Sequence, residues 1–215
     1  VEGGITPSLG TVRAALELAT VPFHVIVRPR GGDFLYSDTE YRSMLADVSA
    51  LANLGVAGVV VGCLNADGTI DETRMGELVR AAGSLNVTCH RAFDMTRDPV
   101  ETLEALVRCG VGRVLTSDQR DSALEGAELL AALVRQAGER IIILGCGGLD
   151  PENIAEVLGK TGLSEMHFAA LADVPSAMRY RNPNVGMGGT DLDREYRTTV
   201  TDGALVAATI AAVRA

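Results

Sequence analysis

Short β-rich runs recur along this chain, and their regular spacing is the feature that most limits its fold. The six runs are Phe23–Val27, Gly58–Cys63, Val87–His90, Arg113–Thr116, Ile141–Leu144 and Glu165–Phe168, and they start 24 to 35 residues apart. Several are nearly continuous apolar segments, which is typical of parallel strands covered on both faces. Each interval has room for one helix and two loops, so the spacing predicts repeated strand–helix units and a mainly parallel sheet.

Capping residues and glycines mark the helices between these runs. The expected helices begin at Ser37 or Asp38, Asp71, Asp98, Ser122 and Asp150, and they end near Gly55, Gly83, Gly110, Gly138 and Gly159. Thr6 and Pro7 predict an earlier helix that runs to about Ala19. A last helix is expected over Asp202–Arg214.

Regular units of this size favour a TIM-type (β/α) barrel over an open doubly wound sheet. No GxGxxG motif follows the first run, which weakens the dinucleotide-binding alternative. A complete barrel has eight strands and typically about 250 residues. We therefore expect residues 1–215 to form one α/β barrel domain in which the first two strands are missing.

The composition narrows the class of partner. The chain has 19 basic and 28 acidic residues, a net charge of −9, which argues against general nucleic-acid binding. It has no polybasic patch for anionic membranes and no apolar run of about 18 residues. Its four cysteines show no CxxC spacing, so we expect reduced thiols in a cytoplasmic protein.

Polar residues follow the first run, where a barrel of this type would place its active site. Arg28, Arg30 and Asp33 lie within six residues, together with Gly31 and Gly32. The arginines suit a carboxylate or phosphate ligand. The alternative is a tight turn with an internal Arg–Asp pair.

A second polar group follows the third run, at His90, Arg91 and Asp94. His90 could act as an acid, a base or a metal ligand, or it could be a hydrogen-bonded structural residue. After the fourth run, the hydroxyls of Thr116 and Ser117 could bind a ligand or cap the next helix, and capping is slightly favoured.

The fifth and sixth runs add candidates for anion binding. Gly145, Gly147 and Gly148 form a loop that leads into a helix, where backbone N–H groups can cradle an anion. His167 lies in the sixth run.

Three of the cysteines, Cys63, Cys89 and Cys146, lie in or just after strands, whereas Cys109 ends a helix. Small buried hydrophobic roles are the favoured interpretation. The alternative is Cu(I) held by the three strand thiolates, alone or together with a histidine.

Several segments together resemble the CutC family of copper homeostasis proteins. They are Glu2-Gly-Gly-Ile-Thr-Pro-Ser8, Arg28-Pro-Arg-Gly-Gly-Asp-Phe-Leu-Tyr-Ser37, His90-Arg-Ala-Phe-Asp94, Arg113-Val-Leu-Thr-Ser117, Ser122-Ala-Leu-Glu-Gly126 and Met178-Arg-Tyr-Arg-Asn182. The resemblance implies a TIM-type barrel in which the six runs are the third to eighth strands. The 145–148 loop and His167 would then lie where barrels of this type often bind phosphate. It also implies that the family's proposed copper-binding cysteines lie on the missing leading strands. Family members usually have Gly where Asp118 stands.

Two functional hypotheses follow. The first is a copper homeostasis protein that binds Cu(I), with Cys63, Cys89 and Cys146 as weak candidates. The second is an enzyme of unknown reaction on a small anionic or phosphorylated substrate. In it His90, Asp94 and Asp33 would be catalytic, and the anion-binding residues would be Arg28, Arg30, Arg91, Ser117, Gly145, Gly147, Gly148 and His167. A barrel without two strands exposes two sheet edges, so a homo-oligomer, dimer or tetramer, is expected.

Overall fold

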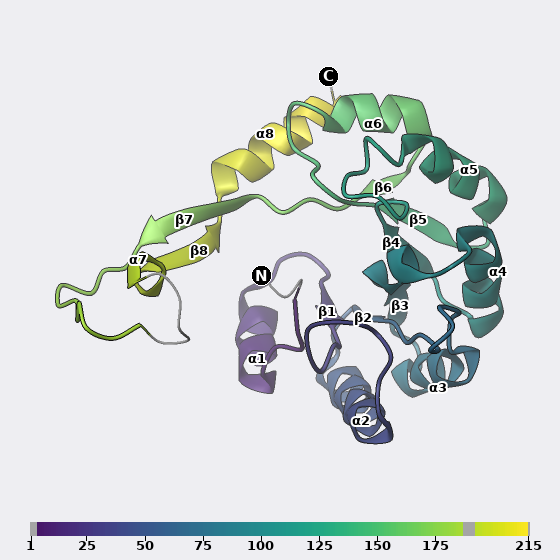
Figure 1. Ribbon diagram of the computed structural model, residues 1–215, viewed down its shortest axis with the longest axis horizontal. Helices are drawn as coiled ribbons and strands as arrows, with labels where there is room; N and C mark the ends of the chain where they lie inside the picture. Colours follow the sequence, from purple (N-terminus) through teal and green to yellow (C-terminus); the bar gives the residue numbers. More distant parts are fainter. Residues whose placement is uncertain (1–3, 187–191, 215) are drawn as a thin grey trace.

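A single curved sheet of six parallel strands forms the body of the molecule. The computed structural model describes residues 4–186 and 192–214, so Glu2 and Gly3 of the first quoted segment lie outside the described residues. The strand order follows the sequence, and the helices lie along the convex side of the sheet (Figure 1). The strands are β1 (His24–Ile26), β2 (Gly58–Val61), β3 (Asn86–Cys89), β4 (Arg113–Thr116), β5 (Ile142–Gly145) and β6 (Glu165–Met166). All six predicted strands are confirmed, and the curvature is that of a TIM-type α/β fold.

One helix or more separates each pair of strands, as predicted. The elements are α1 (Leu9–Leu18), α2 (Asp38–Leu54), α3 (Glu72–Ala82), the 3-10 turn η1 (Arg91–Met95), α4 (Pro99–Cys109), α5 (Ala127–Ala137), α6 (Ile154–Thr161) and α8 (Gly203–Arg214). Ser37, Asp71 and Asp98 cap their helices through side-chain oxygens, which confirms those three starts. These caps satisfy N–H groups that the helix itself leaves unpaired.

Three helix starts differ from the expectation. α1 is capped by Ser8, because the Thr6 hydroxyl instead bonds the backbone N–H and carbonyl of Arg28. α5 begins five residues later than Ser122, since the preceding segment is held in a loop beside the strand ends. α6 begins after a turn in which Asp150 accepts hydrogen bonds from two following backbone N–H groups.

Alternation along the strands separates a helix-facing set of side chains from a concave set. In β4, Val114 and Thr116 are fully buried, whereas Arg113 and Leu115 are only half-buried. Arg113 forms a two-bond ion pair with Glu165 of β6, at 2.7 and 2.9 Å, and this pair reaches across β5. The concave surface is therefore less covered than the helix-facing surface in the described residues.

An arm that the sequence did not predict follows the sheet. β7 (Leu171–Pro175) and β8 (Arg197–Thr201) form an antiparallel hairpin, with the short helix α7 (Leu192–Glu195) between them. The hairpin extends away from the sheet, and α8 returns to pack against α6 (Figure 1). None of the helices within the described ranges is long and apolar enough to cross a membrane.

Two glycine-to-alanine substitutions test how closely the loop before α5 packs on the residues that follow β4. A Cβ at Gly126 would lie 2.4 Å from the Ser117 carbonyl oxygen, whereas a Cβ at Gly159, inside α6, would meet nothing within 4 Å. We expect Gly126→Ala to lower the free energy of unfolding by about 1–3 kcal/mol. Gly159→Ala should raise it by about 0.5–1 kcal/mol, because alanine is the better helix former. Urea unfolding measures both changes, and equal tolerance of the two substitutions would contradict the loop packing at Gly126.

Candidate functional site

The Arg28 side chain lies buried at the end of β1, with 7% of its surface exposed. Its guanidinium donates to the carbonyl oxygens of Gly4 (3.2 Å) and Gly32 (2.7 Å), and it lies 5.1 Å from the centre of the Phe34 ring. Thr6 anchors its backbone. The loop thus holds a buried cation beside an aromatic ring.

His90 lies against the same Phe34 ring. The ring centres of Phe34 and His90 are 4.8 Å apart, and His90 is 4% exposed. Its Nδ1 accepts a hydrogen bond from the Ala92 N–H at 3.1 Å, which places the proton of the neutral imidazole on Nε2. Nε2 is buried and has no hydrogen-bond partner among the described residues.

Burial, followed by the positive charge of Arg28, lowers the pKa of His90 to about 3. His90 is therefore a neutral donor at physiological pH in this structure.

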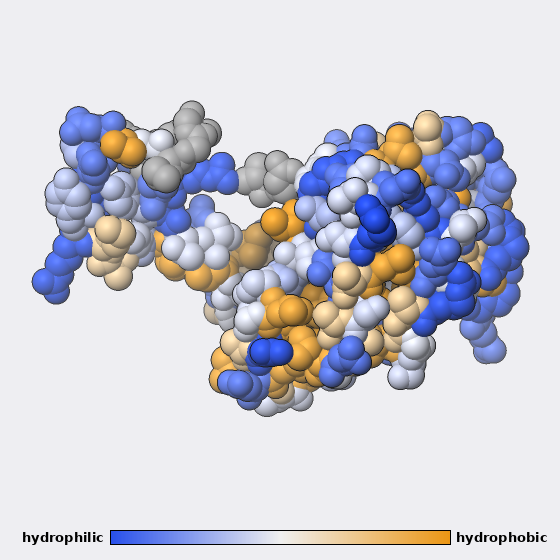
Figure 2. All heavy atoms as spheres, turned by 90° about the horizontal axis from the view of Figure 1, so that it is seen from below, coloured by the Kyte–Doolittle hydropathy of each residue, from blue (hydrophilic) through white to orange (hydrophobic). Residues whose placement is uncertain are grey.

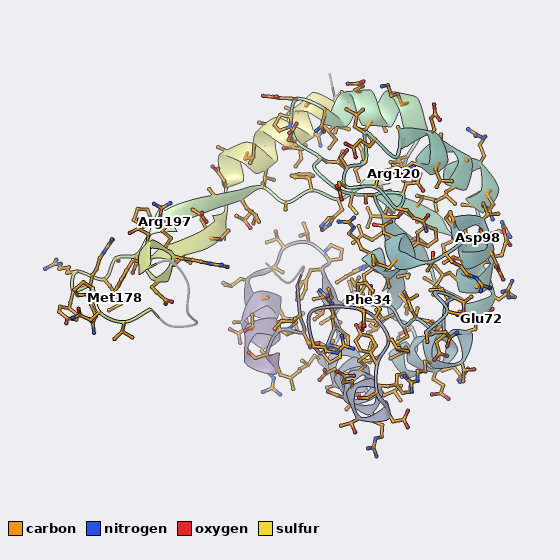
Figure 3. The ribbon with its side chains drawn as sticks, in the orientation of Figure 1. Phe34, Glu72, Asp98, Arg120, Met178 and Arg197 are labelled. Carbon is orange, nitrogen blue, oxygen red and sulfur yellow. The ribbon has the colours of Figure 1, made fainter. Side chains whose placement is uncertain are left out.

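The sequence singled out Arg28 and His90 but missed Phe34 and Gly62. Phe34, labelled in Figure 3, belongs to the RPRGGDF segment, and its contacts with both polar groups became visible only in three dimensions. Gly62 makes room for the imidazole, because a Cβ there would lie 2.5 Å from His90 Cε1.

The Asp94 carboxylate holds the adjacent strand end in place. It accepts hydrogen bonds from Arg91 Nε (2.7 Å), Ser117 N (3.2 Å), Ser117 Oγ (3.1 Å) and Gln119 N (3.2 Å), and also from the Thr116 hydroxyl. The carboxylate is almost fully buried. Both oxygens are occupied, so the geometry supports a positioning role for Asp94.

Arg91 and Ser117 join the same network. Arg91 Nη2 donates to Ser117 Oγ at 2.6 Å, and the Arg91 side chain is 47% exposed. The single proton of the Ser117 hydroxyl has two acceptors within reach, the Arg120 carbonyl at 2.5 Å and the Asp94 carboxylate at 3.1 Å. The expectation that Thr116 or Ser117 caps the next helix is wrong, because α5 has no side-chain cap and both hydroxyls serve this loop.

The glycine loop borders this network. Gly147 and Gly148 have φ values of +99° and +64°, and a Cβ on Gly147 would lie 2.8 Å from Ser117 Cβ. Among the described residues no hydrogen-bond partner is found for the N–H groups of Gly147, Gly148 and Leu149. Gly145 lies at the end of β5, and its carbonyl oxygen accepts a hydrogen bond from the backbone N–H of His167 at 2.8 Å. His167 is exposed, yet desolvation by the surrounding protein lowers its pKa.

Arg30 and Asp33 are engaged within their own loop. Arg30 uses five N–H donors: one bonds Glu40 of α2 (2.6 Å), one bonds Asp33 Oδ1 (3.0 Å), and three bond carbonyl oxygens of residues 31, 33 and 35. The Asp33 side chain is 71% exposed. These contacts match the tight-turn alternative, and the structure does not bring Arg30 or Asp33 to His90.

Asp118 has an unusual environment next to this network. It is 1% exposed, and neither carboxylate oxygen has a hydrogen-bond partner in the described part of the chain. Its φ of +67° is a conformation that favours glycine, which fits the residue expected there from the family resemblance. Desolvation, followed by the negative charge of Asp94, raises its pKa to about 7.

The strand cysteines are buried and are not grouped with other metal-ligating side chains in the described residues. Cys63, Cys89 and Cys146 are each 3% exposed or less. Burial raises the pKa of Cys63 and Cys146 to about 12 and raises that of Cys89 as well, so the thiols stay protonated. Within residues 4–186 and 192–214, no three His, Cys, Asp or Glu side chains are grouped to hold a metal ion. The residues present therefore do not fit a three-ligand copper centre.

Comparison with known proteins agrees with the fold. The model of the CutC family matches residues 1–172. A family protein CutC of Mesorhizobium japonicum is 82% identical over 215 residues, which are 100% of this chain and 83% of that protein. A crystal structure from Streptococcus agalactiae, described as a candidate copper homeostasis protein CutC, is 32% identical with a TM-score of 0.74, covering 77% of this chain and 82% of that one. Inosine 5′-monophosphate dehydrogenase of Legionella pneumophila shares the fold alone, at 11% identity and a TM-score of 0.55 over 97% of this chain and 70% of that one.

The environment of Asp118 leads to a pH-dependent prediction. Folded Asp118 keeps its proton up to about pH 7, whereas an unfolded aspartate releases it near pH 4, so the stability of the native protein rises as pH falls through this window. Asp118→Asn removes the cost of a buried charge. The variant should be more stable than the native protein by about 2–4 kcal/mol at pH 8, and the difference should vanish near pH 4.

Urea unfolding at a series of pH values measures this difference. Asp121→Asn, an exposed change in the same loop, is the matched control and should show no such trend. A pH-independent difference between Asp118→Asn and the native protein would contradict the assignment.

Proposed function

The chain belongs to the CutC family, and we propose that the mouth of its barrel binds a small anionic molecule. The observation that carries this proposal is the unpartnered Nε2–H of the buried, neutral His90. It lies one aromatic ring away from the buried guanidinium of Arg28. A buried donor without a partner is costly unless a ligand or water satisfies it.

The electrostatics of this pair favour an anion. His90 carries no charge, and the positive charge of the nearby Arg28 guanidinium acts on its imidazole. A phosphate or carboxylate oxygen would accept a hydrogen bond from Nε2 and would be attracted by that guanidinium. Such binding would also raise the pKa of His90, because a nearby anion favours the imidazolium.

The second wall of the mouth supports a phosphate-like group. Arg91 is half exposed, and the consecutive N–H groups of Gly147, Gly148 and Leu149 are available beside Ser117. Successive amides with positive φ form concave anion sites in other proteins. We propose an enzyme-type site for a phosphorylated substrate, with His90 exchanging a proton once the anion has raised its pKa.

The six strands also support a register within a full barrel. We propose that β1–β6 correspond to the third to eighth strands of an eight-stranded barrel. β1 and β6 are the open edges of the sheet, and the concave side chains are only half-covered. The glycine loop and His167 would then follow the seventh and eighth strands, where barrels often bind phosphate.

Phosphate titration tests the anion site. We expect inorganic phosphate and glycerol 3-phosphate to shift the amide NMR signals of residues 147–149 and the Nε2–H signal of His90. Arg28→Met and His90→Gln should each weaken binding at least about tenfold, since each removes a charge-assisted hydrogen bond.

The matched control is Arg13→Met, which removes an exposed arginine of α1. It should leave the affinity unchanged. Absence of any shift at saturating phosphate, or equal loss of affinity in the control, would rule out this site.

Cu(I) binding is the second candidate function, and its support is the copper homeostasis name carried by the S. agalactiae relative. The pKa of Cys89 is raised first by burial and then by the charge that a Cys63 thiolate would carry, so the two sulfurs are neighbours, but both thiols are buried and protonated. Copper would have to displace their protons inside the core, so we expect these thiols to bind Cu(I) weakly.

A competition titration with a chromophoric Cu(I) chelator measures that affinity on the reduced protein. We expect the native chain and the Cys63→Ser/Cys89→Ser/Cys146→Ser variant to compete equally. A native affinity at least about tenfold higher than that of the triple variant would instead establish copper binding at these thiols.

A further inference from the structure

The strand β3 lies inside the sheet, between β2 and β4, and carries a column of polar side chains on its concave face. Asn86, Thr88 and His90 occupy alternate positions, so their side chains point to the same side of the sheet. The backbone is still extended at His90, whose N–H donates to the Val61 carbonyl of β2 at 2.9 Å. The column therefore runs from the start of β3 up to the mouth of the barrel.

Hydrogen bonding changes along this column. At its lower end, Asn86 Oδ1 accepts from Arg113 Nη1 at 3.1 Å, and Arg113 is paired with Glu165. The next side chain, Thr88, is 2% exposed, and its hydroxyl has no partner among the described residues. His90 Nε2 above it is in the same condition. Two neighbouring positions of the column thus hold buried polar atoms, and such atoms are costly until a ligand or water satisfies them.

The two unpartnered atoms differ in their electrostatic surroundings. The positive charge of Arg28 acts on His90 at the mouth. The residue paired in register with Thr88 is Arg113, whose charge is matched by the Glu165 carboxylate 2.7 Å away. The outer end of the column thus favours an anion. The inner end offers a neutral hydroxyl, which can donate one hydrogen bond and accept two.

Strand geometry limits the length of a ligand that reaches both atoms. Residues two apart on a strand are separated by about 6.6 Å. With covalent bonds of about 1.5 Å, this distance corresponds to a chain of about three carbons between a phosphate group and an oxygen at the other end. The hydrogen bond between Asn86 and Arg113 closes the column below Thr88, so no unpartnered group of this column continues the site further down.

We propose that Thr88 recognises a hydroxyl or carbonyl oxygen of a short-chain phosphate whose anionic end lies at Arg28 and His90. This role depends on the anion site proposed above, and it adds the chemistry of the ligand beyond its phosphate. Inorganic phosphate would satisfy His90 alone, whereas a hydroxylated or keto phosphate of about three carbons would satisfy both buried atoms.

Ligand entry requires one side chain to move, because both polar atoms are buried. Phe34 contacts Arg28 and His90 and is only partly buried. Its carbonyl oxygen accepts from the Leu64 N–H at 2.9 Å, so the backbone is fixed and the ring moves by rotation about its side-chain bonds. The β7–β8 arm is a lobe apart from the barrel body in Figure 2, so the moving group belongs to the loop after β1 and not to the arm.

Calorimetric titration with glycerol 3-phosphate and n-propyl phosphate tests the role of Thr88. The two ligands share a phosphate and a three-carbon chain, but only glycerol 3-phosphate carries hydroxyl groups. The native protein should bind glycerol 3-phosphate at least about tenfold more tightly, because only that ligand satisfies the buried threonine hydroxyl. Thr88→Val should abolish this preference by weakening the binding of glycerol 3-phosphate.

Thr209→Val is the matched control. Thr209 is 1% exposed, and its hydroxyl donates to the Leu205 carbonyl of α8 at 2.8 Å. This variant should keep the preference for glycerol 3-phosphate. Thermal unfolding without ligand should separate the two variants in the opposite sense. Thr88→Val should raise Tm because it removes a buried hydroxyl with no partner, whereas Thr209→Val should lower Tm because it breaks an existing hydrogen bond.

Titration with inorganic phosphate separates this role from the anion site itself. Two results would overturn the role of Thr88 and leave the anion site standing. One is a native protein that binds phosphate but does not distinguish the two organic phosphates. The other is a Thr88→Val variant that retains the preference. Absence of binding of all three compounds would overturn both the role of Thr88 and the anion site.

Discussion

The Asp94 carboxylate joins segments that would otherwise be independent. It receives hydrogen bonds from η1 through Arg91, from the end of β4 through Thr116, and from the following loop through Ser117 and Gln119. Parallel strands bring their carboxyl ends to one edge, but only contacts of this kind fix the loops there. The same loop carries Gly126, which approaches Ser117, and the backbone turn that holds Asp118, while Gly147 approaches Ser117 from the loop after β5. The shape of the mouth therefore depends on one buried anion that is saturated with donors.

The other side of the mouth has the opposite electrostatic character. Arg28 is a buried cation. Burial and the positive charge of Arg28 together keep His90 neutral, and its Nε2 is then the hydrogen-bond donor. A neutral donor beside a cation suits an oxygen anion. Buried thiols with raised pKa values suit a metal poorly, because each must lose a proton before it binds. Family membership supplies the copper name, whereas our proposal of anion binding rests on the buried Nε2–H of His90 that has no partner in the described residues.

Regular spacing was sufficient to predict the sheet, because each parallel strand needs a helical crossover of nearly constant length. All six strands were located, and the helix starts that are capped by Ser37, Asp71 and Asp98 were correct. Ser122 failed as a start because Ser117 and Gly147 hold the following loop, a long-range effect with no local signal. The hairpin was missed because its strands lie about 25 residues apart and carry mixed polar and apolar residues. Among the site residues, Arg28 and His90 lie together, whereas Arg30 uses its donors on its own loop. Sequence order alone could not distinguish the roles of these two arginines.

Nitrogen chemical shifts of the imidazoles test the central claim most directly. The chain has three histidines, so ¹⁵N-labelled protein and a His90→Gln spectrum identify the His90 signals. Without ligand, His90 should show an unprotonated Nδ1 and a protonated Nε2, with no titration between pH 5 and pH 8, since its pKa lies near 3. A midpoint near pH 6.5, the value of an unperturbed histidine, or a proton on Nδ1 would contradict the buried neutral donor on which the anion site rests.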